Sequence, residues 1–304
     1  MRRPIIVMFC SFFCFMSAPA AADMAPQAPP NRGALFKVTD AGHTLYLFGT
    51  IHVGAIDFYP LEPRVSAALE GASTLALEID PLGDQAAVLE AVRQYGLYPA
   101  RDGSAAAAIK PEFKPRLERL LKQYGIAPES VARMKPWLLA NVLAISEFSA
   151  QGFETSLAVD LYLSQQARAR HIPVLELESV GAQIALFGRM TVAEQSLFLE
   201  EGIVAIENQT QAAQVKELAL AWSTADAAGF DALAKQAAED DSFSGKFVQK
   251  VLLDERNPGL ADGIARLLAR EKNSMAAIGI LHEVGTGSVP ALLRQRGLCV
   301  QRLY

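Results

Sequence analysis

Two histidines and a glutamate have the residue types and surroundings of a metal site. The segments 45–52 and 275–282 are each a largely apolar run that ends in Gly-x-x-His, which places His52 and His282 at the ends of predicted strands. Glu78 lies in a third apolar run, 74–80, where an unpaired carboxylate would be costly to bury, so we expect it to have a cation or a hydrogen-bond donor as partner. Two imidazoles and one carboxylate can hold a divalent transition metal and leave positions open for water and substrate.

Such a site has the requirements for hydrolysis of an amide or ester. A bound metal lowers the pKa of water and polarises a carbonyl group, and Glu78 or a second acid could take the proton. Asp80 follows two residues later on the same face of the strand, so the two acids could act as ligand and base. The alternative for Glu78 is a solvated strand edge, and the alternative for each histidine is a core residue that bonds backbone carbonyls.

Similar elements surround the two histidines. A helix-compatible stretch and then an apolar run follow each one: 61–70 and 74–80 after His52, and 288–296 and 298–303 after His282. Both units therefore read as strand, histidine turn, helix and strand. The order predicts an α/β fold whose central mixed sheet contains two βαβ-like Gly-x-x-His units, hypothetically related by duplication. Each histidine is expected at the carboxyl end of a strand, where α/β sheets bind ligands.

A large helical insertion separates the two units. Apolar residues recur at helical spacing over 111–124, 130–150, 155–170, 191–222, 230–240 and 242–270. Thr191 and Glu194 have the spacing of a capping box. The β-rich segment 172–178 is a candidate strand of the same sheet, and the Ala-rich helices are expected to present mostly solvated faces.

The N-terminus resembles a secretory signal peptide over residues 1–22. Arg2 and Arg3 precede about a dozen mostly apolar residues, and 20–22 offer a small-residue cleavage site. An uncleaved anchor is the alternative, but the apolar run is shorter than the roughly 20 residues that span a bilayer. A Pro-rich mobile lead-in, 23–33, and one domain, 34–304, are expected to follow. The sequence therefore predicts a periplasmic or secreted protein without a membrane span after cleavage.

Charge and cysteine content narrow the function classes. Removal of residues 1–22 leaves 26 Lys and Arg against 33 Asp and Glu, a net charge of −7, which argues against nucleic acid as a partner. Cys10 and Cys14 would leave with the signal peptide, so Cys299 alone could form no intramolecular disulfide. Peptide or protein substrates are possible partners, and the oligomeric state stays open.

Familiar catalytic signatures are missing from the sequence. It contains no H-E-x-x-H, no C-x-x-C, no G-x-S-x-G and no phosphate-binding glycine loop. The glycine-rich segment 285–288 is expected to let backbone approach the site closely. His43 beside Gly42 is expected to cap a turn, and His171 to end a helix, so neither receives a catalytic role.

Several ordered motifs resemble those of the TraB/GumN family, from about residue 34 to the C-terminus. They are 47–54 (LFGTIHVG), 76–80 (ALEID), 135–137 (KPW), 175–178 (LELE) continuing to Gln183, 255–258 (ERNP) and 279–282 (GILH). The family is similar to the Tiki metalloproteases. The resemblance implies a metal-dependent hydrolase with His52, Glu78 and His282 as metal ligands. It also implies catalytic roles for Glu78, Arg256 and Asn257, in which the guanidinium binds a substrate carboxylate or stabilises an oxyanion.

The resemblance leaves some acidic residues without a fixed role. Asp160 and Glu178 match acidic positions of the family, and a helix-surface role for Asp160 is the alternative. Glu283 departs from the pattern, because an aliphatic residue is expected after the second histidine. It could be an added ligand, an acid that orients His282, or an exposed residue.

Two hypotheses of different classes follow. The leading one is a secreted or periplasmic metal-dependent hydrolase, of the peptidase kind, that uses Mn, Co, Zn or Fe, which these ligands do not distinguish. The alternative is a non-catalytic protein that binds a metal, haem or another ligand in the same pocket. A role in export or conjugation machinery rests on family names only and ranks last.

Overall fold

The computed structural model describes residues 29–99 and 103–304. The predicted signal peptide, 1–22, lies outside these residues, as does most of the lead-in. At the end of the lead-in, Arg32 is buried and donates to the carbonyls of Pro60 and Asp57, and the Gly33 amide donates to Trp222 O. Within the described residues, no helix has both the length and the apolar character needed to cross a bilayer.

A six-stranded mixed sheet forms one half of the molecule. Its strands are β1 (Leu35–Asp40), β2 (His43–Thr50), β3 (Leu75–Leu77), β4 (Val174–Glu176), β5 (Asn273–Gly279) and β6 (Cys299–Arg302). Their order is β4-β3-β5-β2-β1-β6. The four strands β4, β3, β5 and β2 are parallel, whereas β1 runs antiparallel to both β2 and β6. The expected α/β fold with a mixed sheet is confirmed.

The two Gly-x-x-His units interleave in this sheet. The first runs from β2 through α1 (Pro63–Glu70) to β3, and the second from β5 through α14 (Val289–Gln295) to β6. β5 lies between the two strands of the first unit, and β2 and β1 lie between those of the second. β5 is buried from Ser274 onward, as expected of a central parallel strand. The sheet thus makes β2 and β5 direct neighbours.

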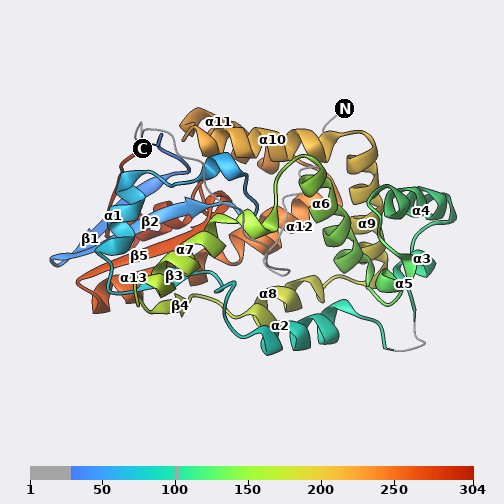
Figure 1. Cartoon of the computed structure of the whole chain (residues 1–304), viewed down its shortest axis with the longest axis horizontal. Coiled ribbons are helices and arrows are strands. Elements are labelled where there is room, and N and C mark those ends of the chain that lie inside the picture. The colour runs from blue at the N-terminus through green and yellow to red at the C-terminus, as the bar shows by residue number, and fades with distance from the viewer. Residues whose placement is uncertain (1–28, 100–102) are drawn as a thin grey trace.

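Helices make up most of the chain between β3 and β5, and many of them lie to the right of the sheet in Figure 1. Those before β4 are α2 (Gln85–Ala91), α3 (Ala105–Ala108), α4 (Lys114–Gln123), α5 (Pro128–Val131), α6 (Pro136–Ala150) and α7 (Val159–Ala169). Those after it are α8 (Val180–Phe187), α9 (Val192–Glu207), α10 (Thr210–Ser223), α11 (Ala227–Ala238), α12 (Phe243–Phe247) and α13 (Asn257–Arg270). Short 3-10 segments are η1 (Ile56–Phe58), η3 (Pro111–Phe113), η4 (Thr155–Leu157) and η6 (Ile280–His282), and π-helical turns are η2 (Val92–Gly96) and η5 (Val248–Asp254).

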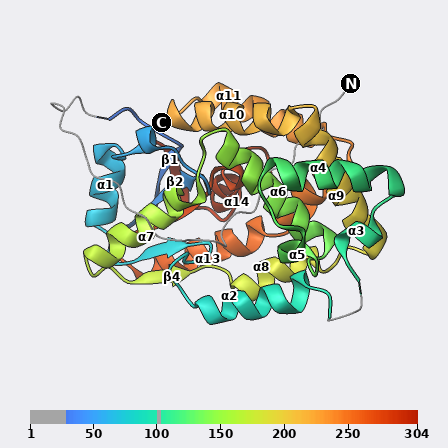
Figure 2. The same ribbon diagram turned by 45° about the vertical axis from the view of Figure 1, so that its right-hand side comes forward.

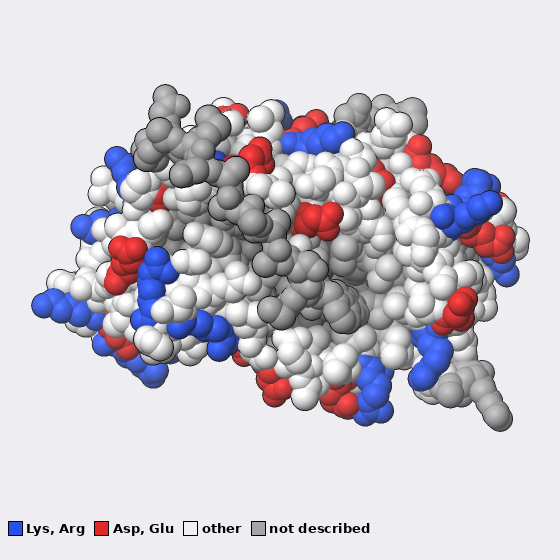
Figure 3. Space-filling view, viewed as in Figure 1, with Lys and Arg blue, Asp and Glu red and all other residues white. Residues whose placement is uncertain are grey.

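The described residues form two apolar cores. One surrounds the sheet, where α13, α7 and α1 contact its strands. The other lies among α4, α6, α8 and α9, grouped away from the sheet in Figure 2, and includes a stacked pair, Trp137 and Phe187, with ring centroids 4.6 Å apart. Charged side chains of both signs are interspersed over the face in Figure 3, in agreement with the mixed charge pattern of the sequence.

Two long helices expected from the sequence are interrupted. The stretch 191–222 divides at Gln209, whose backbone is left-handed with φ of 61°, although its N-terminal capping box at Thr191 and Glu194 is confirmed. The stretch 242–270 contains η5, where the Glu255 amide donates to the carbonyl of Lys250, five residues back. π-helical turns of this kind are frequent at functional sites, and η5 leads directly into Arg256.

Candidate functional site

The ends of three neighbouring parallel strands bring His52, Glu78 and His282 together. β5 has β2 on one side and β3 on the other, with Thr50 opposite Gly279 and Leu77 opposite Ala277. The Nε2 atom of His52 lies 4.0 Å from Glu78 Oε1, and that of His282 lies 3.7 Å from Glu78 Oε2. The expected juxtaposition of these three side chains is therefore present, and their role as metal ligands stays a prediction.

Glu78 is buried rather than a solvated edge residue. Its side chain is 6 % exposed, Oε1 accepts from the Gly279 amide at 2.6 Å, and Oε2 contacts Nη2 of Arg256. Burial alone would raise its pKa, but the ring of His282, the guanidinium of Arg256 and the Gly279 amide hold the pKa well below the usual range. Glu78 is thus a fixed negative charge at the centre of the site.

Arg256 is the cation that balances this charge. Its Nη2 also donates to Glu178 Oε2 at 2.5 Å, and its Nε donates to the same carboxylate at 3.0 Å. Nη1 donates to Leu252 O at 2.9 Å and lies 3.1 Å from Nε2 of His282. Its side chain is 4 % exposed, so a buried guanidinium bridges two carboxylates and one imidazole. Removal of one partner from such a buried pair strongly destabilises the fold, because the other charge stays buried without compensation.

Asn257 fixes the tautomer of His282. The Asn257 amide nitrogen donates to Gly287 O at 2.8 Å, which directs its Oδ1 at His282 Nδ1, 2.6 Å away. We infer that Nδ1 carries the proton and that Nε2 presents a lone pair, which accepts from Arg256. Burial and the nearby guanidinium lower the pKa of His282 to about 3, against a smaller opposing effect of Glu78, so the ring is neutral at ordinary pH.

Asp160 plays the corresponding part for His52. It lies in the first turn of α7, is 5 % exposed, and places Oδ2 3.2 Å from His52 Nδ1. A plain helix-surface role for Asp160 is therefore wrong. Burial opposes protonation of His52, but the carboxylates of Asp160 and Glu78 outweigh it and raise the pKa of this ring above 6.5. The same contact directs Nε2 of His52 at Glu78.

Gly279 keeps the space between these side chains open. A Cβ atom at this position would lie 3.0 Å from His52 Nε2, 3.2 Å from Glu78 Oε1 and 3.7 Å from His282 Cδ2. Any side chain would therefore occupy the point on which the three groups converge. Gly279, the glycine of the second Gly-x-x-His, is therefore needed to keep the site open. Its position in the sequence did not reveal this role.

Two acids expected near the site lie elsewhere. Asp80 accepts from Ser164 Oγ at 2.6 Å and from Arg168 at 2.5 Å, so it holds α7 and does not form a ligand and base pair with Glu78. Glu283 is 4 % exposed, so the expectation of an exposed residue is wrong. Its carboxylate lies against Gly49 and has no hydrogen-bond partner within the described residues, whereas Asn257 is the partner of His282.

The two other histidines are outside the site. His43 contacts Leu268 O through Nδ1 at 2.7 Å, and His171 has a left-handed backbone with φ of 58° at the end of α7. Sequence reasoning gave Gln183 no role, yet its amide donates to Glu178 at 2.8 Å and lies 3.5 Å from Glu78. The sequence feature that could have indicated this role is the place of Gln183 at the end of the segment that begins with the LELE motif.

The side-chain types of His52, Glu78 and His282 are those that a divalent transition metal takes, and their use as ligands stays a prediction. Two atoms each about 2.1 Å from one ion lie at most about 4.2 Å apart, and the separations of 4.0 and 3.7 Å from Glu78 fall within that limit. They are wider than a compact tetrahedral arrangement, and no group of three or more His, Cys, Asp or Glu side chains over 29–99 and 103–304 has the spacing of a formed metal site. Binding at Nε2 of His282 would require Arg256 to release that atom.

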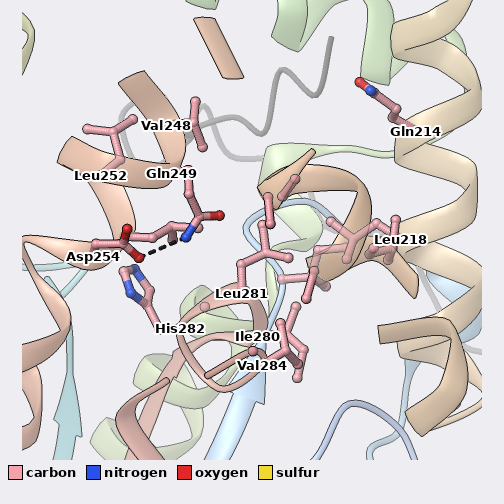
Figure 4. Close-up of a pocket in the computed structure, with 18 of the residues that line it drawn as sticks. Gln214, Leu218, Val248, Gln249, Leu252, Asp254, Ile280, Leu281, His282 and Val284 are labelled. Carbon is pink, nitrogen blue, oxygen red and sulfur yellow. Dashed lines mark hydrogen bonds between the residues drawn. The ribbon is translucent and has the colours of Figure 1, made fainter. Parts of the chain in front are cut away.

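A cavity of about 500 Å³ opens beside the two histidines. His52, Asn257 and His282 are among its lining residues, together with many apolar side chains of α10, α11 and η5. Figure 4 shows His282 and Leu281 on one side of this space, with Leu252 and Leu218 around it. Most residues of the Ala-rich helix α11 are exposed, as expected, and Leu233, Ala234, Ala237 and Ala238 form its cavity side.

The chain is similar to known proteins over most of its length. A family model described as the TraB/PrgY/gumN family matches residues 34–302. The uncharacterized protein YbaP of Escherichia coli (strain K12) is 26% identical over 249 residues, which cover 82% of this chain and 87% of that protein. YbaP of Shigella flexneri matches with the same values. No solved structure matches the chain. With a match over nearly all of the described residues, the chain belongs to the TraB/PrgY/gumN family.

Proposed function

We propose that this protein is a metal-dependent hydrolase of the peptidase kind, acting in the periplasm or outside the cell. The observation that carries the proposal is the convergence of two imidazole Nε2 atoms on the buried Glu78 carboxylate, around a point that Gly279 keeps free of side-chain atoms. His52, Glu78 and His282 would hold Mn, Co, Zn or Fe. The bound ion would supply an acidified water and a polarised carbonyl.

The remaining residues prepare this donor set. Asp160 and Asn257 hold the Nδ1 atoms, so that both rings aim Nε2 at Glu78. Asn257 therefore positions His282. Arg256 compensates the charge of Glu78 and Glu178, and its Nη1 lies beside the ligand atom of His282, where it can bind a substrate carbonyl as negative charge develops. Glu78 is ionised and can hold a cation, and the charges that lower its pKa make it a weak proton acceptor.

A non-catalytic binding protein is the second candidate. The specific observation that favours it is the apolar cavity of about 500 Å³, which could hold haem or another ligand beside the histidines without any reaction. In that case Arg256 would keep its contact with His282, and metal binding would not be needed.

Metal content is the decisive first measurement. The mature protein without an affinity tag is stripped, reloaded with each of Mn, Fe, Co and Zn, and compared by elemental analysis with the double variant His52→Ala, His282→Ala. The matched control is His43→Ala, His171→Ala, which also removes two imidazoles. We expect near one metal ion per chain in the wild type and the control, and a clear loss in the site variant.

Hydrolysis is tested with the preferred ion. Peptide pools should be cleaved by the loaded wild type and the control, and by neither the site variant nor the chelator-treated protein. Equal and low metal in all three proteins would contradict the metal site. Full metal occupancy without turnover on peptides or esters would favour the second candidate.

A further inference from the structure

The cavity beside the histidines is built for an apolar group. Apolar side chains of its lining include Val215 and Leu218 of α10, Leu233 of α11, and Val248 and Leu252 of η5. Its volume of about 500 Å³ lies within the range of roughly 300–1,000 Å³ that is typical of ligand pockets. Because most of the lining residues are apolar, the cavity favours a ligand with a large apolar portion.

The charges of the lining restrict the class of ligand further. Among the described residues that line the cavity there is no Lys or Arg, and Asp254 is the sole carboxylate. Asp254 accepts from the Gln249 amide at 2.8 Å at the rim, as Figure 4 shows. The head group of an anionic lipid would find no cation in this lining and would face a carboxylate. The lining therefore disfavours an anionic group, and its mostly apolar residues favour an uncharged one.

The loop after His282 offers backbone donors along the same cavity. Gly285, Thr286 and Gly287 line it and are exposed, and their amides donate to no protein acceptor in the part of the chain that the structure describes. Peptide carbonyls accept hydrogen bonds from such a run of amides, and a neighbouring pocket then selects the side chain. An acyl chain carries no comparable series of acceptors.

One element places both the cavity and the site. η5 directs Val248 and Leu252 into the cavity lining, and Leu252 O accepts from Arg256, which contacts Glu78 and His282. An apolar side chain in the cavity would therefore hold the adjacent backbone beside the two histidines.

We propose that this cavity is a selectivity pocket for a large, uncharged apolar side chain of a peptide, whose backbone lies along the loop 285–287. The proposal deepens the hydrolase function proposed above and rests on it for its biological meaning. Binding itself is measurable without turnover, so the two can fail separately.

Peptide binding is measured by fluorescence anisotropy with the wild-type mature chain, both metal-loaded and chelator-treated. The probes are labelled Gly/Ser hexapeptides, blocked at both ends, in which one central residue is Ala, Leu, Phe, Lys or Glu. We expect the Leu and Phe peptides to bind about tenfold to a hundredfold more tightly than the Ala, Lys and Glu peptides.

Paired variants locate the selectivity. Leu218→Glu places a carboxylate in the cavity and should transfer the preference from the Leu peptide to the Lys peptide, an exchange that simple destabilisation would not produce. Leu220→Glu is the matched control, because Leu220 is on the same helix, is 64% exposed and does not line the cavity. Ala234→Phe should fill the space beside Gly285 and thereby weaken the binding of the Leu and Phe peptides. The exposed Ala232→Phe is its control.

Each outcome separates this inference from the proposed function. Selective binding of Leu and Phe peptides without hydrolysis supports the pocket and contradicts the peptidase. Hydrolysis with no difference between the Ala and Leu peptides, or a Leu218→Glu variant that keeps the Leu preference, overturns the pocket. Tight binding of a neutral dodecyl probe with no measurable binding of any peptide would overturn the peptide class.

Discussion

The two Gly-x-x-His units share a sequence pattern but use it differently. His52 is paired with the carboxylate of Asp160, whereas His282 is paired with the amide oxygen of Asn257 and is almost completely buried. The pKa of the first ring is raised and that of the second is lowered to about 3. A repeated motif thus gives one imidazole that is protonated more readily than a free ring and one that stays neutral.

Gly49 and Gly279, the glycines of the two units, also differ in what they contact. Gly279 faces the histidine of the other unit, since a Cβ atom there would lie 3.0 Å from His52 Nε2. Gly49 faces the turn of the other unit, since a Cβ atom there would lie 2.3 Å from Ile280 Cδ1 and 2.7 Å from Glu283 Oε2. Because the units interleave in the sheet, each glycine makes room for its partner unit, one in the site and one in the core behind it.

The largest effect on stability is expected from Gly49→Ala. The added methyl group overlaps Ile280 and crowds the buried Glu283 carboxylate, so we expect a loss of about 2–3 kcal/mol in the free energy of unfolding. Urea unfolding followed by circular dichroism measures it. Gly42→Ala does not serve as a control because Gly42 has a positive φ, but Gly259→Ala does, since nothing lies within 4 Å of its Cβ position. Equal stabilities for Gly49→Ala and Gly259→Ala would remove the packing role of Gly49.

Gly279→Ala should instead damage the site. The contacts at 3.0 and 3.2 Å need shifts of only a few tenths of an ångström, so the loss of stability should be smaller than for Gly49→Ala. Metal affinity should fall at least about tenfold, an effect of about 1.4 kcal/mol. Isothermal titration with the preferred ion measures this. Unchanged affinity would mean that the ion does not bind at the point Gly279 keeps open.

The residues that directly follow the two histidines also differ, since Val53 is apolar and Glu283 carries a carboxyl group. Burial raises the pKa of Glu283 well above 4.5, against a smaller opposing effect of Arg302. A carboxyl group with a raised pKa in the folded state makes the protein lose stability as pH rises above the unfolded value. Glu283→Gln should therefore be more stable than the wild type by about 1–2 kcal/mol at pH 8, and by less at pH 4.5.

Unfolding curves at several pH values test this prediction. The exposed Glu239→Gln is the matched control and should show no difference that widens with pH. A pH-independent difference for Glu283→Gln would contradict an unpaired buried carboxyl group.

The smallest effect concerns the histidine rings in the metal-free protein. We expect imidazole NMR to show His52 titrating above pH 6.5 and His282 remaining neutral down to about pH 3. His52 then contributes stability that is complete below pH 6.5 and is lost as pH rises through its raised pKa. His282 costs stability as pH falls from 6.5 towards 3, because the unfolded chain binds the proton first.

Asp160→Asn identifies the cause of the first shift. The variant should lower the pKa of His52 and leave that of His282 unchanged. If both rings titrate together in the wild type, the contrast between their partners is wrong.

Much of the fold could be predicted because it rests on local patterns. Apolar runs and helical spacing indicated the Gly-x-x-His strands, the helices that follow them and the helical insertion between the units. The strand β1 and the breaks at Gln209 and η5 were missed. A single left-handed residue and a widened helical turn change few side-chain contacts along the sequence, so the periodic pattern does not reveal them.

Residue chemistry alone determined which side chains could meet in a site. Gly-x-x-His at the ends of two apolar runs and a carboxylate in a third select His52, His282 and Glu78, because a buried charge needs a partner and parallel strand ends converge. The tertiary structure alone decided the rest. The order of the strands brought Glu78 within 4.0 Å of both imidazoles. Packing of the helices placed Arg256 beside them, paired Asp80 with Arg168 and gave each histidine a different acceptor. These outcomes depend on the distances between residues far apart in the chain, which only packing sets.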